Sequence, residues 1–503
     1  MSIRRLSMTN AVLVAVVAVS WCFCSCSLTS AHRLDRGRPR HKHGMLGEPM
    51  YYARHDFQLP QILWLEQRLN HFDPSDRRTW RQRYMVNDQF YSEGGPVFLL
   101  LGGEGEASPL WLSARTHVML MAQKFGALVF QLEHRYYGKS RPTEDLSTRN
   151  LAYLTSQQAL ADAAAFRTLM TDQRKLGPDA RWVVFGGSYS GSLAAWFKLK
   201  YPHLVVGAVA SSAPMVALID FVDYASVVRD SLGPECSAKV QQAVRELESM
   251  ASHRINWPAI DKKFKTCVPF DAFNKLNLQN FFQSVAGLFE GVVQYNKDQR
   301  ISGPSNITID TLCHLMTNNQ KSALEGLVSV NQLLMDSGNQ SCLDYDYDAF
   351  VRSMRNVSFE APSAEGGRQW TYQTCVEFGF FQSSDAKDQP FGHHFPVQLF
   401  IQQCQDIFDD FFDVDMLNRA VRRTNTEYGG TLPQLRNVTF PNGSIDPWHA
   451  LGILRDLAED VTANYIEGTA HCADMYPPAD TDERSLSRAR DKIEKQVAEW
   501  LRR

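Results

Sequence analysis

The sequence predicts an α/β fold in which a disulfide-stapled helical insertion interrupts a domain built on a parallel sheet. Short apolar runs alternate with helical patterns between residues 59 and 214. The alternation is lost from about 216 to 365, where helical patterns and cysteines dominate, and it returns near the C-terminus. Strands that alternate with helices favour a parallel sheet covered on both faces. We therefore expect one α/β domain in two segments, 59–214 and 366–503, separated by an insertion at 215–365.

The composition is that of a folded protein. Of the 503 residues, 44% are hydrophobic and 21% are charged, which excludes a disordered chain, a collagen and a coiled coil. The 52 lysines and arginines nearly balance the 55 acidic residues, for a formal net charge of −3. Nucleic-acid binding depends on clustered positive charge, so no nucleic acid is expected as a partner.

Residues 1–31 have the pattern of a signal peptide. Arg4 and Arg5 supply the positive start, residues 11–23 are mostly apolar, and small residues follow, as a cleavage site requires. The apolar run is shorter than the ~20 residues that a membrane span needs, so no stable membrane insertion is expected after cleavage. A short signal anchor is the alternative. Residues 32–58 are expected to form a basic leader or a propeptide.

Cysteines and glycosylation motifs also indicate export. The chain after the signal peptide holds seven cysteines without C-x-x-C spacing, which suits disulfides in an oxidising compartment better than a zinc site. These are Cys236, Cys267, Cys313, Cys342, Cys375, Cys404 and Cys472. Five Asn-x-Ser/Thr motifs predict N-glycosylation at Asn306, Asn339, Asn356, Asn437 and Asn442. The predicted location is the secretory pathway, with a product that is secreted or delivered to the lysosomal or endosomal lumen.

The first segment, 59–214, carries the clearest strand and helix patterns. A short apolar run that ends in glycines is typical of a buried parallel strand. A stretch dense in Ala and Leu, with its larger apolar residues on one side, is typical of a helix. The expected strands are 96–101, 127–131, 182–185 and 205–210, and the expected helices are 156–170 and 190–200.

The insertion and the last segment differ in pattern. Helical patterns in the insertion cover 238–249, 272–289 and 320–335. In the last segment, short strands are expected at 437–440 and 464–466. The last helix is predicted from apolar residues that share one face, namely Leu486, Ile493, Val497 and Leu501.

Ser188 has the setting of a catalytic nucleophile. It lies in Gly-Gly-Ser-Tyr-Ser-Gly (186–191), after the 182–185 strand and before a helix, where a tight turn lifts a serine hydroxyl off the sheet edge. Small residues at Gly186 and Ser190 are needed because larger side chains would collide with neighbouring backbone in this turn. A purely structural turn is the alternative.

A serine nucleophile needs a general base, and the base needs an orienting carboxylate. Asp446 follows the 437–440 strand and His471 follows the 464–466 strand, so both lie in loops at strand ends. Taken alone, Asp446 would be an ordinary Asp-Pro turn and His471 a structural imidazole. The chain order Ser, Asp, His and the loop settings together predict a triad of Ser188, Asp446 and His471.

The remaining requirement is an oxyanion hole made of backbone N–H donors. Tyr189, directly after the nucleophile, supplies one donor. The glycine-rich loop 102–106 supplies the second, from Gly103 or Glu104, because glycine allows the close backbone approach that an oxyanion demands. The match of this segment to a phosphate-binding loop is weak, since it lacks the Gly-Lys-Ser/Thr ending.

Four further motifs accompany the Ser188 turn. They are Glu-His-Arg-Tyr-Tyr-Gly-Lys-Ser (133–140), Ser-Ser-Ala-Pro (211–214), Trp-Thr-Tyr-Gln-Thr-Cys (370–375) and Asn-Gly-Ser-Ile-Asp-Pro-Trp (442–448). Together, from about residue 67 to His471, the chain resembles the prolyl-carboxypeptidase family of serine peptidases. The resemblance implies an α/β-hydrolase domain with a helical insertion over the active site. It also implies that Ser188 is the nucleophile, Asp446 the orienter and His471 the general base.

The cysteines can be paired in many ways by spacing alone. The resemblance implies the pairs Cys236–Cys313, Cys267–Cys342 and Cys375–Cys404, and we expect Cys472 to be a free thiol beside His471. Residues 468–476 are most similar to the thymus-specific serine protease branch of the family. Cys472 and Tyr476 stand where the two proline-specific exopeptidases of the family have a histidine and an arginine. A preference for proline before the cleaved bond is therefore left open.

The predicted function is that of a serine-type, exopeptidase-like peptidase. It hydrolyses short or unfolded peptides through an acyl-enzyme and needs no metal or organic cofactor. The residue preference, the mode of attack and the oligomeric state are left open, a homodimer included. Two alternatives remain: a lipase or carboxylesterase with the same triad, and a non-catalytic binding protein on a hydrolase fold.

Overall fold

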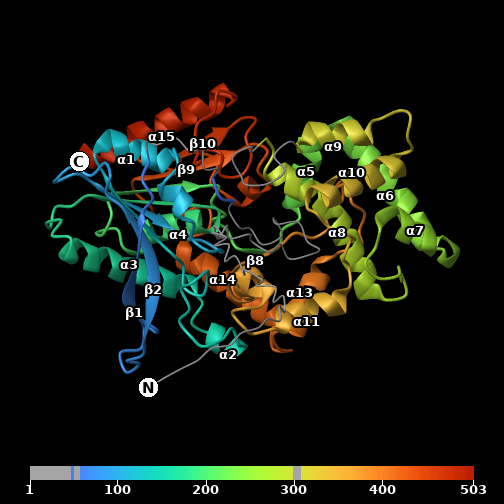
Figure 1. The fold of residues 1–503 in the computed structure, drawn as a ribbon, viewed down its shortest axis with the longest axis horizontal. Coiled ribbons are helices and arrows are strands. Elements are labelled where there is room, and N and C mark those ends of the chain that lie inside the picture. Colours follow the sequence, from blue (N-terminus) through green and yellow to red (C-terminus); the bar gives the residue numbers. More distant parts are fainter. Residues whose placement is uncertain (1–46, 50–56, 298–306, 503) are drawn as a thin grey trace, which may run out of the picture. The chain divides into compact units, whose positions relative to one another are not determined.

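The structure of the chain is a computed structural model (Figure 1) that describes residues 47–49, 57–297 and 307–502. The expected signal peptide, most of the leader 32–58 and the glycosylation motif at Asn306 lie outside the described residues. In the described part of the chain, no helix combines the length and the apolar character that a bilayer crossing needs.

An eight-stranded, mostly parallel sheet forms the centre of the fold, with the strand order β1-β2-β4-β3-β5-β6-β9-β10. The strands are β1 (Gln61–Arg68), β2 (Thr79–Asn87), β3 (Val97–Leu101), β4 (Leu128–Leu132), β5 (Trp182–Gly187), β6 (Gly207–Ser211), β9 (Val438–Gly443) and β10 (Val461–Ile466). β2 pairs antiparallel with β1 and with β4, and the other pairs are parallel. This is an α/β-hydrolase fold, which confirms the fold class expected from the sequence.

Helices cover both faces of this sheet, and alternate residues of each central strand point to opposite faces. In β3, Val97 and Leu99 belong to the core with two of these helices, α3 and α4, whereas Phe98 belongs to the core with α1 and α15. The covering helices are α1 (His117–Phe125), α3 (Ser156–Gln173), α4 (Tyr189–Lys200) and α15 (Arg484–Arg502). Because both faces are buried, β3, β4 and β5 are apolar almost throughout, which is the pattern that predicted them.

The antiparallel strands β1 and β2 were not expected from the sequence. β2 looks polar because it carries Gln82 and Arg83, yet both side chains are buried. Arg83 pairs with the buried Glu133, which directly follows β4, and the Gln82 amide donates to the Glu133 carbonyl oxygen at 2.7 Å. Partners distant in the sequence satisfy these polar groups, so a strand that looks exposed lies inside the sheet.

Between β6 and β9 the chain is mainly helical. The helices are α5 (Asp223–Leu232), α6 (Pro234–Ala251), α7 (Trp257–Phe264), α8 (Lys275–Gln294), α9 (Ile309–Met316), α10 (Ala323–Ser337), α11 (Tyr347–Arg355), α12 (Gly367–Gln373), α13 (Val397–Ile407) and α14 (Val414–Tyr428). A short parallel pair, β7 (Leu218–Asp220) with β8 (Gly379–Phe381), lies among them. The chain re-enters the large sheet only at β9, so helices continue well past residue 365.

The helices after residue 365 pack against the hydrolase domain, which explains why a boundary there is not marked by a new strand. Tyr428, at the end of α14, stacks on Trp196 of α4 with ring centroids 4.0 Å apart. Trp370 of α12 contacts the ring of Tyr189 at 5.5 Å. The segment 366–428 therefore packs against α4, the helix that follows Ser188, without adding a strand to the large sheet.

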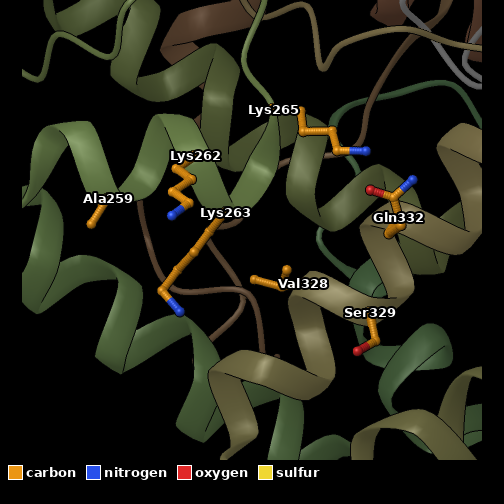
Figure 2. A pocket seen from close by; sticks show the side chains of 7 residues that line it. All are labelled: Ala259, Lys262, Lys263, Lys265, Val328, Ser329 and Gln332. Carbon is orange, nitrogen blue, oxygen red and sulfur yellow. The ribbon is translucent and has the colours of Figure 1, made fainter.

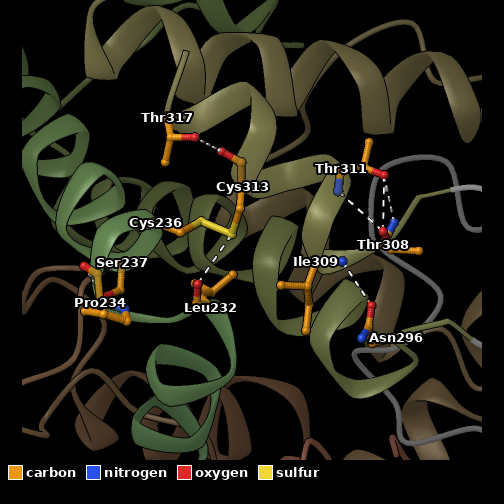
Figure 3. The surroundings of a disulfide bond; sticks show 10 residues. All are labelled: Leu232, Pro234, Cys236, Ser237, Asn296, Thr308, Ile309, Thr311, Cys313 and Thr317. Atoms are coloured by element: carbon orange, nitrogen blue, oxygen red, sulfur yellow. Dashed lines mark hydrogen bonds between the residues drawn. A yellow bond between two sulfur atoms is a disulfide. The ribbon is translucent and has the colours of Figure 1, made fainter. Parts of the chain in front are cut away.

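Three disulfides join parts of the helical region: Cys236–Cys313, Cys267–Cys342 and Cys375–Cys404. They are the pairs that the family resemblance implied. Figure 3 shows the first, which links α6 to α9. In the same view, the Ile309 N–H donates to the side-chain oxygen of Asn296 at 3.0 Å, which ties the start of α9 to the chain just after α8.

Candidate active site

Ser188 lies at a strained turn between β5 and α4. Its φ of 60° and ψ of −133° are sparsely populated for a residue with a side chain. Its backbone N–H donates to the carbonyl oxygen of Ser211 on β6 at 2.9 Å, which fixes the turn to the neighbouring strand. A Cβ at Gly186 would overlap the backbone of Ser190, so only glycine fits there. The Ser190 hydroxyl donates to the Gly187 carbonyl oxygen at 2.8 Å, which accounts for a small polar residue at that position.

Asp446 and His471 meet at the same edge of the sheet. β9 and β10 pair in parallel, so the loops that follow them emerge side by side. Nδ1 of His471 lies 2.8 Å from Oδ2 of Asp446, and both side chains are fully buried. The other carboxylate oxygen of Asp446 accepts from the Trp448 N–H at 3.0 Å, which holds the carboxylate in one orientation.

This contact determines which histidine nitrogen is free to act as a base. A carboxylate accepts a hydrogen bond from Nδ1–H, so the neutral ring keeps the lone pair on Nε2. Nε2 of His471 makes no hydrogen bond to any residue that the structure describes. Ser188 follows β5, which runs parallel to β6 and β9, so it lies at the same edge of the sheet, and no hydrogen bond joins it to Nε2. Catalytic hydrogen bonds of unliganded enzymes are often long and tighten when substrate binds.

The helical insertion also contributes to this site, through the end of α8. The carbonyl oxygen of Gln294 accepts the backbone N–H of His471 at 2.9 Å. Its side-chain oxygen accepts from Nε1 of Trp448 at 3.0 Å and from the hydroxyl of Tyr224 at 2.7 Å. The next residue, Tyr295, sets its ring edge-on to the His471 ring, with centroids 5.8 Å apart. No motif in the sequence marks Gln294 or Tyr295, and sequence reasoning missed both.

The loop expected to complete the oxyanion hole follows β3 and lies beside the turn. The position of a Cβ on Gly103 would be 3.5 Å from the Ser190 Cβ, which places this backbone next to the start of α4. Tyr189 is the first residue of α4, and its hydroxyl accepts from Nε2 of Gln373 at 2.9 Å. The Glu104 side chain, for which the sequence predicted no role, is buried next to the Ser188 hydroxyl.

Comparison with known proteins identifies the family. A family model described as Serine carboxypeptidase S28 matches residues 67–493. The chain belongs to the S28 family of serine peptidases. This confirms the resemblance seen in the motifs.

Individual relatives match this chain over most of its length. The Caenorhabditis elegans protein K12H4.7 is 39% identical over 93% of this chain and 93% of its own length. The thymus-specific serine protease of Homo sapiens is 37% identical over 88% of this chain and 87% of its own length. The human lysosomal Pro-X carboxypeptidase is 28% identical over 88% of each chain.

Cys472 is a free and fully buried cysteine of this S28 peptidase. Its backbone N–H donates to the Ser212 hydroxyl at 2.9 Å, and its sulfur lies 3.9 Å from the carbonyl oxygen of Ser211. Burial raises the pKa of the thiol well above its usual value, and the nearby Asp446 carboxylate raises it further. The thiol therefore stays protonated and serves as packing beneath the Ser188 turn.

The predicted glycosylation sites differ in accessibility. Asn339 and Asn356 are exposed, and Asn437 is half-buried with its amide donating to the Val206 carbonyl oxygen at 2.9 Å. Asn442 is 2% exposed and lies within β9, and its amide donates to the Ile453 carbonyl oxygen at 3.1 Å. A glycan at Asn442 is incompatible with this burial, so we no longer expect one there.

One pocket of the described residues lies on the insertion, between α7 and α10 (Figure 2). Its volume is about 670 Å³, and Figure 2 shows three lysines around it, Lys262, Lys263 and Lys265. These lysines lie at the C-terminal end of α7, where positive side chains favourably meet the negative end of the helix dipole. Their clustering is explained by the helix, and none of the predicted site residues lines the pocket.

Proposed function

We propose that this chain hydrolyses peptide bonds through an acyl-enzyme, with Ser188 as nucleophile, His471 as general base and Asp446 as orienting carboxylate. The observation that carries the proposal is the 2.8 Å contact between Nδ1 of His471 and Oδ2 of Asp446, beside the strained Ser188 turn. It leaves Nε2 as the available base at the edge where the serine hydroxyl emerges. The family supplies the reaction class, because S28 proteins are serine peptidases.

The proposed chemistry follows from these positions. Nε2 of His471 takes the Ser188 proton as Oγ attacks the carbonyl carbon, and it then gives that proton to the leaving amine. A water molecule, activated by the same nitrogen, later hydrolyses the acyl-enzyme. The Tyr189 N–H and a backbone N–H of the Gly103–Glu104 loop stabilise the oxyanion in both steps. The fully buried Asp446 carboxylate stabilises the imidazolium that forms on His471 in each step.

The substrates we propose are short or unfolded peptides. The support is the position of the insertion, since the end of α8 reaches the loops of both His471 and Asp446. A helical region so close to the base limits the space for a folded protein chain. An end-trimming mode is consistent with the relative named lysosomal Pro-X carboxypeptidase.

The residues at positions 472 and 476 do not support a preference for proline before the cleaved bond. Cys472 and Tyr476 are both fully buried, and the Tyr476 hydroxyl donates to the Gly47 carbonyl oxygen at 2.8 Å. Neither side chain is available to hold a substrate group. We therefore propose a specificity that does not depend on these two positions, in a protein of the secretory pathway.

The test compares matched peptide and acyl-ester substrates with the native chain and Ser188→Ala. We expect peptide cleavage and covalent labelling by a fluorophosphonate, both abolished in Ser188→Ala while the unfolding temperature stays unchanged. Turnover of esters without any peptide cleavage would favour the lipase or carboxylesterase alternative. No labelling of the folded native chain would favour the binding protein.

A further inference from the structure

A buried carboxyl group faces the proposed nucleophile. Glu104 lies on the loop after β3 and is 3% exposed. The Ser188 hydroxyl and Glu104's own backbone N–H both lie close enough to lower the pKa of the carboxyl by hydrogen bonding. Oε1 of Glu104 has no hydrogen-bond partner among the described residues. A buried polar atom without a partner needs an explanation in a native protein, and the position of this one beside the proposed nucleophile suggests a role in the reaction.

Among the residues that the structure describes, the groups that act on Glu104 come from three other elements, and no cation forms an ion pair with it. Ser188, on the turn after β5, lies within hydrogen-bonding reach of it, and Tyr137, on the loop after β4, and Tyr295, at the end of α8, lie near enough to interact with it electrostatically. Burial raises the pKa of both tyrosines well above the usual value, so both phenols stay neutral. The guanidinium of Arg83 pairs instead with Glu133 and with Glu106, which lies on the same loop as Glu104.

This surrounding favours the neutral form of the carboxyl. Moving a carboxylate out of water without a cation or several donors is costly, so the proton is retained instead. Burial raises the pKa of Glu104 to about 8, even though Ser188 and its own N–H act in the opposite direction. At neutral and acidic pH, Glu104 therefore carries an O–H donor next to the atom that attacks the substrate.

We propose that the protonated side chain of Glu104 donates a hydrogen bond to the oxyanion that forms when Ser188 attacks, beside the backbone donors of the same loop. The inference rests on the proposed function, because it assigns a role in that reaction. No proton is transferred in this step: the O–H bond of Glu104 stays intact while its hydrogen bond to the developing charge shortens. An ionised Glu104 would instead repel the oxyanion, so only the neutral form supports the reaction.

The proposal predicts that kcat/KM depends on the ionisation of Glu104. Activity needs the proton on Glu104, so kcat/KM falls as the pH rises through the pKa of this carboxyl. Glu104→Gln keeps a donor at every pH, so we expect its kcat/KM to stay within about tenfold of the native value near pH 6 and the alkaline fall to disappear. Glu104→Met keeps the length without any donor, so we expect a loss of about 10²-fold at every pH.

The experiment measures kcat/KM from about pH 5 to pH 9 for the native chain, Glu104→Gln, Glu104→Met and a control, Glu106→Gln. Glu106 lies on the same loop but is 39% exposed and pairs with Arg83, so Glu106→Gln should leave the alkaline fall unchanged. Each peptide is tested with a free and with an acetylated N-terminus. An alkaline fall that is identical in native and Glu104→Gln proteins would overturn the proposal. A loss in Glu104→Gln confined to peptides with a free N-terminus would also overturn it, since Glu104 would then be a carboxylate that binds an ammonium group.

Two readouts separate this inference from the proposed function. The rate of fluorophosphonate labelling at Ser188 has the same dependence on Glu104, because the phosphoryl oxygen occupies the oxyanion position, and it needs no peptide substrate. The unfolding free energy of the native chain should fall as pH rises from about 4.5 to 8, since the folded state holds the Glu104 proton longer than the unfolded state. Glu104→Gln should lack this part of the fall. If no peptide is cleaved while both readouts still respond to Glu104→Gln, the proposed function fails and the ionisation of Glu104 stands.

Discussion

The backbone N–H of His471 donates a 2.9 Å hydrogen bond to the carbonyl oxygen of Gln294, the last residue of α8. The insertion therefore does more than cover the hydrolase domain, because its longest helix ends on the loop that carries the proposed base. The Gln294 side chain extends this contact to Trp448, two residues from Asp446. The positions of the proposed base and of its proposed orienting carboxylate are thus tied to one residue of the insertion.

Replacing Gln294 should impair catalysis more than binding. Gln294→Ala leaves Nε1 of Trp448 and the hydroxyl of Tyr224 without their acceptor, at a cost of about 1–3 kcal/mol of unfolding free energy. Loosened loops should lower kcat by about tenfold to 10²-fold with a smaller change in KM. Steady-state kinetics and thermal unfolding check both values. Gln332→Ala on α10, a half-buried glutamine whose amide donates to Asp336 of the same helix, is the control and should change neither.

The orienting role of Asp446 predicts a large effect from a small change. Asp446→Asn keeps the shape and the contact with the Trp448 N–H but offers an N–H to Nδ1 of His471, which stabilises the wrong tautomer. We expect kcat to fall by about 10⁴-fold with little change in the unfolding temperature. A loss below tenfold would contradict the proposed triad. Asp456→Asn, at an exposed carboxylate that accepts from the Ala463 N–H, is the matched control.

The Cys472 thiol should be unreactive in the folded protein. Its sulfur is fully buried, and its raised pKa keeps it protonated at pH 8, whereas alkylation requires the thiolate. We expect iodoacetamide to modify Cys472 only after unfolding, as measured by peptide mapping. Rapid alkylation of the native protein would show that the site opens. Cys472→Ala should retain peptidase activity, because the thiol is not part of the proposed chemistry.

N-glycans should be attached only to those Asn-x-Ser/Thr motifs whose asparagine is exposed. Peptide mapping of protein from a glycosylating host should find glycans at the exposed Asn339 and Asn356 and none at Asn442. Asn442→Ala removes the donor to the Ile453 carbonyl oxygen and should cost about 1–3 kcal/mol of stability. Asn356→Ala, at an exposed position, should change stability by no more than about 0.5 kcal/mol. A glycan on Asn442 in folded protein would contradict its placement in β9.

The central strands and the nucleophile turn were predictable because their signals are local. β3 and β5 are runs of apolar residues buried on both faces, and the turn at Ser188 needs small residues within two positions on either side. β2 was not predictable, because Arg83 is acceptable in a buried strand only through Glu133, which lies 50 residues further along the chain. The return of the chain to the sheet at β9 was predicted by the apolar run at 437–440. The start of the second hydrolase segment, expected at residue 366, has no strand to mark it, since the helices before β9 pack on the hydrolase domain.

The sequence by itself determined the fold class, the order of Ser188, Asp446 and His471, and the family, since these depend on short motifs and on periodicity within each element. Only the tertiary structure decided that α8 holds the His471 loop, that Asn442 is inaccessible, and that the Glu104 carboxyl is buried next to Ser188. Each of these depends on burial and on contacts between residues far apart in the chain. Burial is set by the whole packed structure, and it changes what a side chain can do while leaving its motif unchanged.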